Sequence, residues 1–217
     1  MTLKEISDRA AQENLAIFGA FAPKSEDLPP DNCKTLVLLG PLEPGFWAHI
    51  QTSPEFADAR PDPMDRWSHR VITAIAADVY ATPVFPFGGP PFQPFIRWAM
   101  ASGQAWQSPA GPLVHARAGM MVSYRGALAL PYDIDLPAPM PRPCETCAEK
   151  PCLTACPVNA LSVAAGYNLN RCHNHLDTAA GRDCMTQGCA ARRACPVSKT
   201  YARLPAQSAF HMKSFHP

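Results

Sequence analysis

The sequence predicts an α+β fold in two parts, on the basis of three observations. The first 136 residues alternate helix-like and strand-like segments, and a proline-rich connector follows at residues 137–143. Eight of the nine cysteines then lie within 52 residues, from Cys144 to Cys195. We therefore expect a mixed domain over residues 1–136 and a cysteine-rich domain over residues 144–217, in a chain long enough to bury a full core.

Apolar runs and turn residues predict the elements of the first part. In chain order they are a helix over 2–14, strands over 15–21 and 35–40, helices over 44–50 and 62–79, an edge strand over 81–87, a helix over 95–103, and strand-like segments over 111–115, 120–124 and 126–131. Thr2 can cap the first helix, because Glu5 completes a capping box. Asp62 and Pro63 suit the cap and the first position of the longest helix. The prolines within 81–87 exclude a central position in a sheet.

Fewer elements are expected in the cysteine-rich part. Asn170 can cap a short helix that ends at Asp177 and carries Cys172 at its start. Another short helix is expected within 185–194. The connector at 137–143 is expected to be stiff and extended because four of its seven residues are proline.

The cysteine pattern indicates metal clusters. The run from Cys144 reads C-E-T-C-A-E-K-P-C-L-T-A-C-P, and the run from Cys184 reads C-M-T-Q-G-C-A-A-R-R-A-C-P. A C-x-x-C pair, a third cysteine and a final Cys-Pro are the signature of [4Fe–4S] ligation in bacterial ferredoxins, and the second run has it in degenerate form. Three closely spaced cysteines on a curling loop can reach three iron corners. The cysteine before proline points away and ligates the other cluster.

This crossover rule divides the eight cysteines into two sets. The first cysteine set is Cys144, Cys147, Cys152 and Cys195, and the second cysteine set is Cys156, Cys172, Cys184 and Cys189. We expect each set to hold one [4Fe–4S] cluster. The alternatives are a zinc site, which usually pairs two C-x2–4-C motifs without Cys-Pro, and a disulfide framework, which is typical of secreted proteins. Cys33 lies outside both sets and is expected to be a buried, inert thiol.

Charge and hydropathy narrow the function classes. The net charge of +1 gives no reason to expect a nucleic-acid partner. Residues 141–217 carry nine Lys and Arg against four Asp and Glu, and we interpret this excess as an offset to anionic clusters rather than an RNA-binding face. The basic residues concerned are Arg171, Arg182, Arg192 and Arg193. We expect no signal peptide, no membrane span and a reducing, cytoplasmic location.

Several motifs carry a resemblance to a known family. The isolated Asn170-Arg171-Cys172 between the two cysteine runs resembles the C-terminal part of epoxyqueuosine reductase and the corrinoid reductive dehalogenases. The stretches 99–106 and 114–131 resemble that family's helix ending in Ala-Gly-Leu-Gly-Trp and the His-Pro-Arg-Phe-Gly-Gly-Trp region of CblC-type B12-processing proteins. Asp62-Pro63-Met64-Asp65 resembles a CblC-type Asp-Pro-Val-Asp. The lysine of the family's Gly-Trp-x-Gly-Lys is absent after Trp106, and no catalytic acid can be assigned.

The resemblance implies a nitroreductase-like domain that holds cobalamin beside a ferredoxin-like domain with two clusters. His115 and Arg117 are then candidates for contact with a corrinoid, a flavin or an anionic substrate; otherwise they are a surface histidine and an ordinary paired arginine. Tyr124 is a candidate proton donor, against a half-buried strand aromatic. His173 and His175 are expected beside the second cluster or on the surface, because cysteines already supply eight ligands.

Three functions remain open from the sequence. The first is an iron–sulfur redox protein that passes electrons to a cofactor or substrate at the N-terminal domain, of the corrinoid-reductase or B12-processing type. The second is a ferredoxin-like carrier whose N-terminal domain binds no cofactor and docks a redox partner protein. The third is a flavin-containing iron–sulfur reductase. Two-cluster electron transfer is common to all three, whereas enzymatic activity is not.

Overall fold

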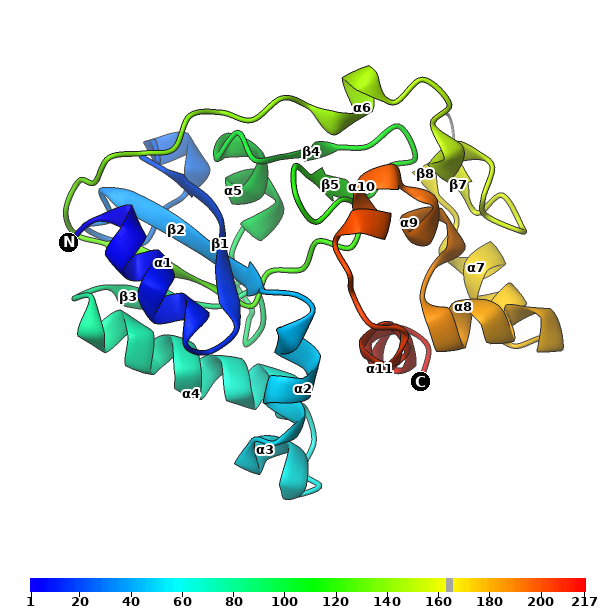
Figure 1. Cartoon of the computed structure of the whole chain (residues 1–217), viewed down its shortest axis with the longest axis horizontal. Helices are drawn as coiled ribbons and strands as arrows, with labels where there is room; N and C mark the ends of the chain where they lie inside the picture. Colours follow the sequence, from blue (N-terminus) through cyan, green and yellow to red (C-terminus); the bar gives the residue numbers. More distant parts are fainter. Residues whose placement is uncertain (163–165) are drawn as a thin grey trace. The chain divides into compact units, whose positions relative to one another are not determined.

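The computed structural model describes residues 1–162 and 166–217 and has an α+β fold with small sheets and many helices (Figure 1). The chain forms two compact units. Unit 1 comprises residues 1–105 and 123–140, and unit 2 comprises residues 106–122 and 141–217. The segment 106–122, which the sequence assigns to the first domain, therefore packs with the cysteine-rich residues. No helix in the described part of the chain is long and apolar enough to cross a membrane.

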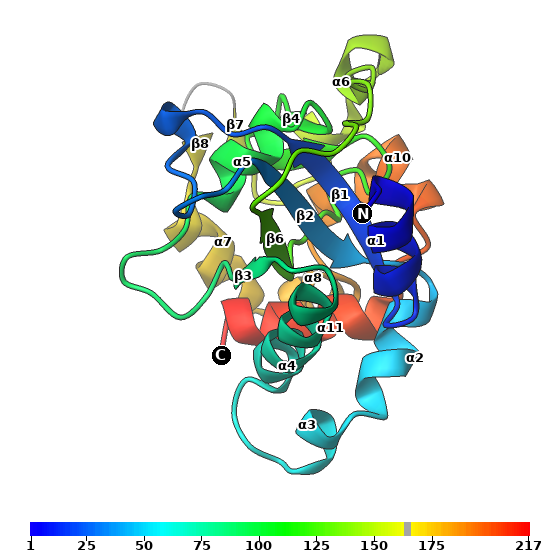
Figure 2. The same cartoon turned by 90° about the vertical axis from the view of Figure 1, so that its left-hand side faces the viewer.

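Unit 1 is built on a four-stranded antiparallel sheet in the order β1-β2-β6-β3, visible in Figure 2. The strands are β1 (Leu15–Phe21), β2 (Thr35–Pro41), β6 (Gly126–Leu130) and β3 (Thr82–Val84). Every residue of β2 and β6 is buried, as their continuous apolar runs predict for central strands. Pro83 lies in β3 at the edge, which confirms the edge strand.

Five helices surround this sheet. They are α1 (Leu3–Ala11), α2 (Gly45–Gln51), α3 (Pro54–Ala57), α4 (Pro63–Asp78) and α5 (Phe95–Ala101), with a 3-10 turn at Ser25–Asp27. The predicted capping box at Thr2 is confirmed, with Glu5 as its second partner. Helix α4 packs on β3 and β6, where Ile72 lies against Gly126. The prediction for Asp62 is wrong in one respect, because Asp62 has φ 52° and its side chain makes no capping hydrogen bond.

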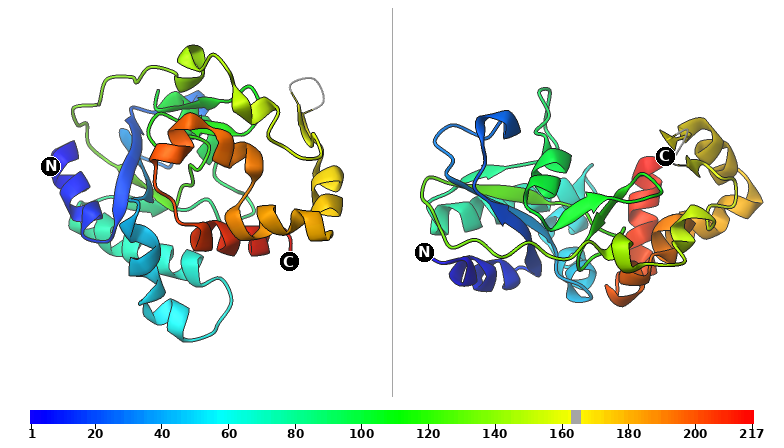
Figure 3. Two further views of the ribbon diagram at one scale, coloured as in Figure 1. Left: turned by 45° about the vertical axis from the view of Figure 1, so that its right-hand side comes forward. Right: turned by 90° about the horizontal axis from the view of Figure 1, so that it is seen from above.

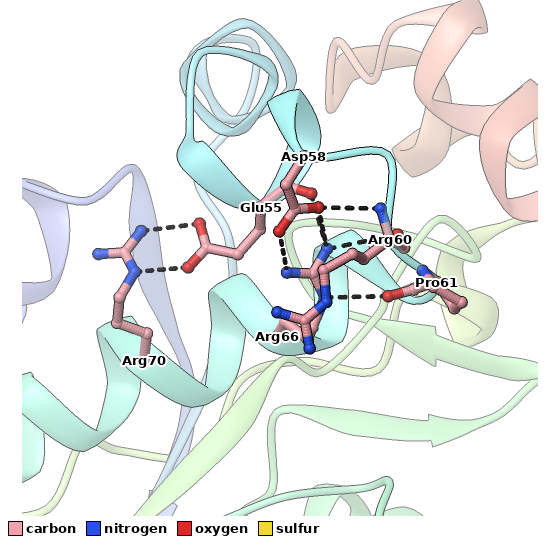
Figure 4. Close-up of polar contacts among 6 residues, drawn as sticks. All are labelled: Glu55, Asp58, Arg60, Pro61, Arg66 and Arg70. Atoms are coloured by element: carbon pink, nitrogen blue, oxygen red, sulfur yellow. Dashed lines mark hydrogen bonds and ion pairs between the residues drawn. The ribbon is translucent and has the colours of Figure 1, made fainter.

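Two arginines of α4 hold the short helix α3 in place (Figure 4). Arg70 binds both carboxylate oxygens of Glu55 at 2.5 and 3.0 Å, and the Glu55 side chain is only 10% exposed. Arg66 binds both oxygens of Asp58 at 2.7 Å. These bonds lower the pKa values of Glu55 and Asp58, each to about 2, chiefly through the hydrogen bonds from the arginines. The network is structural, because its bonds bind protein groups to one another.

Arg125 is a buried cation beneath the sheet of unit 1. Its guanidinium forms an ion pair with Asp65 and donates to Ser68 Oγ at 3.1 Å. Phe87 covers it, with the guanidinium carbon 5.8 Å from the ring centre. Burial lowers the pKa of Arg125, and the carboxylate of Asp65 opposes that shift. Asp65 therefore does more than begin α4, because it balances a charge that folding removes from water.

Unit 2 consists of short elements on a small apolar core. In chain order they are β4 (Ala105–Gln107), β5 (Leu113–His115), α6 (Pro143–Thr146), η2 (Pro151–Leu153), β7 (Leu161–Ser162), β8 (Gly166–Tyr167), α7 (Leu169–Leu176), η3 (Ala179–Gly181), α8 (Arg182–Gln187), α9 (Ala190–Ala194), α10 (Pro196–Thr200) and α11 (Pro205–Phe215). The core joins Val114 and Met120 to Cys152 and Cys195. Helix α11 packs beside α8, as Figure 3 shows in red and orange.

The strand predicted over 120–124 is wrong, because side chains of the cysteine-rich part occupy the backbone groups of this segment. Arg192 donates to the carbonyls of Met120 and Val122. Arg203 donates to the carbonyl of Met121 at 2.7 Å. The N–H of Met120 donates to Ser198 Oγ at 2.9 Å. Three consecutive carbonyls are thus bound by guanidinium groups instead of by a neighbouring strand.

One prediction for the cysteine-rich part also needs correction. The side chain of Asn168, not of Asn170, caps α7 by accepting from the N–H of Arg171 at 2.9 Å. The short helix predicted within 185–194 is confirmed as α9, and Gly188, which has φ 88°, separates it from α8. A side chain at Gly188 would meet Ser208 of α11, so the break also permits close helix packing.

Candidate metal centres in unit 2

The first cysteine set surrounds a cavity of about 460 Å³. Cys144 lies in α6, Cys147 ends that helix, and Cys152 lies in η2. Cys195 comes from a segment more than forty residues later, between α9 and α10. It has an extended backbone, and Pro196 begins α10 directly after it. The thiol of Cys195 thus joins the cysteines of the first run, although Cys195 itself ends the second run.

The second cysteine set surrounds a cavity of about 560 Å³. Cys172 lies in α7, Cys184 in α8, and Cys189 immediately precedes α9. Cys156, the other cysteine followed by proline, joins them from the first run. The seven cysteines of the two runs, together with Cys172 between them, are therefore distributed four and four. Each run contributes its Cys-Pro cysteine to the set of the other run.

Electrostatics within each set oppose thiolate formation in the absence of a cation. Burial raises the pKa of Cys144, and the neighbouring thiols Cys152, Cys195 and Cys147 raise it further. Burial likewise raises the pKa of Cys172, and Cys189 and Cys156 add to the rise. The cysteines that raise these values belong to the same set in each case. Four thiolates around one cavity would need a positively charged group between them.

The surroundings of the two cavities differ. Apolar side chains line the second cavity together with Tyr167 and Arg192; they include Met120, Val122, Leu161, Leu176 and Phe215. The first cavity is bordered by exposed, charged residues, namely Glu149, Lys150 and Lys199. The first cavity thus has more charged groups at its border than the second.

The four arginines that the sequence singles out have different surroundings. Arg192 lines the second cavity. Burial lowers the pKa of its guanidinium, and the negative charge of Cys189 partly offsets that shift. Arg193 is occupied by Asp183 and by the carbonyl of Gly188. Arg171 and Arg182 are exposed. Of these four arginines, only Arg192 lines a cysteine cavity.

An aromatic group that the sequence did not indicate lies against Cys172. The hydroxyl of Tyr167 donates to Cys172 Sγ at 3.3 Å. The Tyr167 ring stacks on Phe215 with 6.3 Å between ring centres, and His173 stacks on Phe215 at 4.7 Å. His173 Nδ1 lies 2.7 Å from His216 Nδ1, as part of the same group. His175 lines the second cavity, and its Nε2 is buried without a hydrogen-bond partner in the structure.

The candidate cofactor residues belong to two different units. His115 belongs to unit 2 and is fully buried, so it is not a surface histidine. Its Nδ1 accepts from the N–H groups of Arg117 and Ala118, both at 3.2 Å, which closes the turn after β5. Arg117 is exposed. Tyr124 belongs to unit 1, where burial raises the pKa of its phenol and the hydroxyl has no hydrogen-bond partner.

A third cavity of unit 2, about 540 Å³, lies beside the first cysteine set. Cys144 and Lys150 line both cavities, and Trp106 contributes an aromatic wall. Ser108 lines it as well, and its buried hydroxyl has no hydrogen-bond partner in the structure. The size suits a small organic molecule.

All nine cysteines are free thiols. Cys33 donates to the carbonyl of Thr35, and burial raises its pKa to about 11, as for an inert thiol. Among the described residues, no group of three or more His, Cys, Asp or Glu side chains is arranged to hold a single metal ion. A cubane differs from a single ion because its ligands surround a four-iron core instead of converging on one atom.

Comparison with known proteins gives no relative. No protein-family model, curated protein or solved structure matches the chain.

Proposed function

We propose that this protein is an iron–sulfur electron-transfer protein with one [4Fe–4S] cluster on each cysteine set. One observation carries the proposal. The division of eight cysteines that follows from the ferredoxin crossover rule coincides with the division between two cavities of about 460 and 560 Å³. A disulfide framework would not need this exchange of Cys156 and Cys195 between the runs.

The residues around both cavities fit such clusters. Each cavity offers four free thiols, which is the ligand number of a [4Fe–4S] cluster. When bound, a cluster of this type supplies reversible one-electron transfer. The chain's own part is to position the thiols, to surround the second cavity with mostly apolar side chains, and to set the charge of Arg192 beside Cys189.

A second candidate function adds a destination for the electrons. The resemblance to corrinoid reductases favours a cofactor-dependent reductase, and the third cavity beside Cys144 is the observation that supports a small-molecule site. A corrinoid and a flavin are the two cofactor classes proposed. Without either, the protein would be a carrier that serves a redox partner protein in a reducing compartment such as the cytoplasm.

The cluster proposal is tested by removing one ligand. Cys172 is the best choice, because it lies in α7 and its loss leaves α9, which joins the two sets, untouched. Wild-type protein purified anaerobically should contain about eight iron atoms per chain, and Cys172→Ser about four. Cys33→Ser is the matched control and should retain all the iron, because Cys33 belongs to unit 1. Iron below about two atoms in the wild type, or an unchanged content in Cys172→Ser, would refute the assignment.

The two candidate functions are separated by a binding experiment. Anaerobic wild-type protein is mixed with hydroxocobalamin or flavin mononucleotide and passed over a gel-filtration column, with absorbance recorded across the spectrum. Co-elution of either cofactor supports the reductase, and a Co(I) spectrum after reduction identifies the corrinoid type. Elution of both cofactors apart from an iron-loaded protein supports the carrier.

A further inference from the structure

Tyr167 stands apart from the other residues around the cysteine sets, because its hydroxyl binds a ligand thiol directly. The Tyr167 hydroxyl donates to Cys172 Sγ at 3.3 Å, which is within the range for a hydrogen bond to sulfur. Tyr167 ends the short β8 strand, whose partner β7 fixes it through the pairing of Leu161 with Tyr167. The donor therefore comes from a different element than the α7 helix that carries Cys172.

The ring of Tyr167 is held in place by the C-terminal helix. Phe215 of α11 stacks on Tyr167 with an interplanar angle of 11°, and His173 stacks on Phe215 at 21°. Tyr167 is nevertheless 45% exposed, so one edge of the ring faces solvent. The stack fixes the hydroxyl toward Cys172, and the partial exposure makes the ring tolerant of small substitutions.

A hydrogen bond to a ligand sulfur changes the energies of the two oxidation states unequally. Reduction places one more negative charge on the centre and its thiolates, and an O–H donor stabilises the more negative state more strongly. A nearby positive charge acts in the same direction, and Arg192 lies at the same cavity. The hydrogen bond from Tyr167 and the positive charge of Arg192 therefore both favour reduction of the second centre.

We propose that the Tyr167 hydroxyl raises the reduction potential of the centre on the second cysteine set and leaves that of the first set unchanged. This inference rests on the proposed two-cluster function and adds a role for one residue within it. Tyr167 is a positioning and tuning residue, because it acts on the centre through the sulfur of Cys172.

The test is the reduction potential of each centre, measured by anaerobic redox titration with EPR detection. Signals of the second centre are those that Cys172→Ser removes. In Tyr167→Phe, which keeps the stacking ring, the ratio of reduced to oxidised second centre at a fixed potential should fall about tenfold, or about 59 mV for one electron. The first centre should not move. Tyr80→Phe is the matched control, because Tyr80 is 80% exposed in unit 1.

A second variant keeps the proposal testable if Tyr167→Phe loses iron. 3,5-Difluorotyrosine at position 167 has a more acidic phenol and is a stronger hydrogen-bond donor, so it should shift the second centre in the opposite direction, to a higher potential. The inference is overturned if the available variants leave the second potential unchanged, or move both centres equally. A wild-type protein without two EPR-active centres would instead overturn the proposed function itself, which keeps the two failures distinct.

Discussion

Gly119→Ala tests the contact that holds the segment 106–122 in unit 2. Gly119 has φ +56°, and a Cβ built there would lie 2.6 Å from Ser198 Oγ and still closer to the main-chain nitrogen of Ser198. The left-handed backbone costs an alanine roughly 1–2 kcal/mol. The overlap with a rigid backbone adds about 1–3 kcal/mol, and displacement of the hydrogen bond from Met120 to Ser198 adds about 1 kcal/mol. We expect a total loss of roughly 3–6 kcal/mol in the free energy of unfolding.

Gly111→Ala separates backbone strain from the clash. Gly111 also has a positive φ, of +102°, but nothing lies within 4 Å of a Cβ built on it. Thermal unfolding of the anaerobic protein, followed by far-ultraviolet circular dichroism, should give a melting temperature lower by about 10 °C for Gly119→Ala and by only about 2–4 °C for Gly111→Ala. Equal losses in the two variants would refute the close packing of Gly119 on Ser198.

The remaining predictions concern ion pairs of unit 1. Arg70→Gln removes the group that lowers the pKa of Glu55 from 4.5 to about 2. A carboxyl group whose pKa is lowered by folding stabilises the fold at pH values above its pKa in the unfolded chain. Arg70→Gln should therefore reduce the free energy of unfolding, measured by hydrogen exchange, by about 1–2 kcal/mol above pH ~5. This loss should vanish as the pH falls through about 2. A loss of stability that persists at pH ~2 would contradict this explanation. Lys4→Gln is the control: it removes an exposed ion pair with Asp8 and should lower the free energy of unfolding by less than about 0.5 kcal/mol. Asp65→Asn leaves the buried Arg125 without its carboxylate and should lower the free energy of unfolding in urea by about 2–4 kcal/mol. The double variant Asp65→Asn with Arg125→Met should lose less, because it leaves no unpaired buried charge. The explanation fails if the double variant is as unstable as the single one.

Local patterns in the sequence predict the parts of the fold in which neighbours along the chain decide the structure. The continuous apolar run of β2 identifies a buried strand, and Pro83 identifies the edge strand. The capping box at Thr2 depends on residues within one helical turn. The same reasoning divides the eight cysteines into the two groups that surround the two cavities, because spacing and Cys-Pro steps are local features.

Contacts between distant positions explain what the sequence could not predict. Residues 120–124 have the apolar character of a strand, but Arg192 and Arg203, 72 and 82 positions away, bind their carbonyls. Tyr167 is a single aromatic before a cysteine in the sequence, and only the β7–β8 pairing directs its hydroxyl at Cys172. The ion pair between Asp65 and Arg125 joins the segments 62–65 and 114–131 through two residues that lie 60 positions apart, so the spacing within either segment does not reveal it.

Helix α9 explains why the two cysteine sets cannot be regarded as independent modules. Cys189 of the second set immediately precedes this five-residue helix, and Cys195 of the first set immediately follows it. Arg192, between them, binds the carbonyls of Met120 and Val122. A displacement of α9 would therefore disturb one ligand of each set and the segment 120–122 together. Changes at Cys189 or Cys195 test the whole unit, whereas a change at Cys172 tests one centre, and this difference determines which variants can separate the two centres.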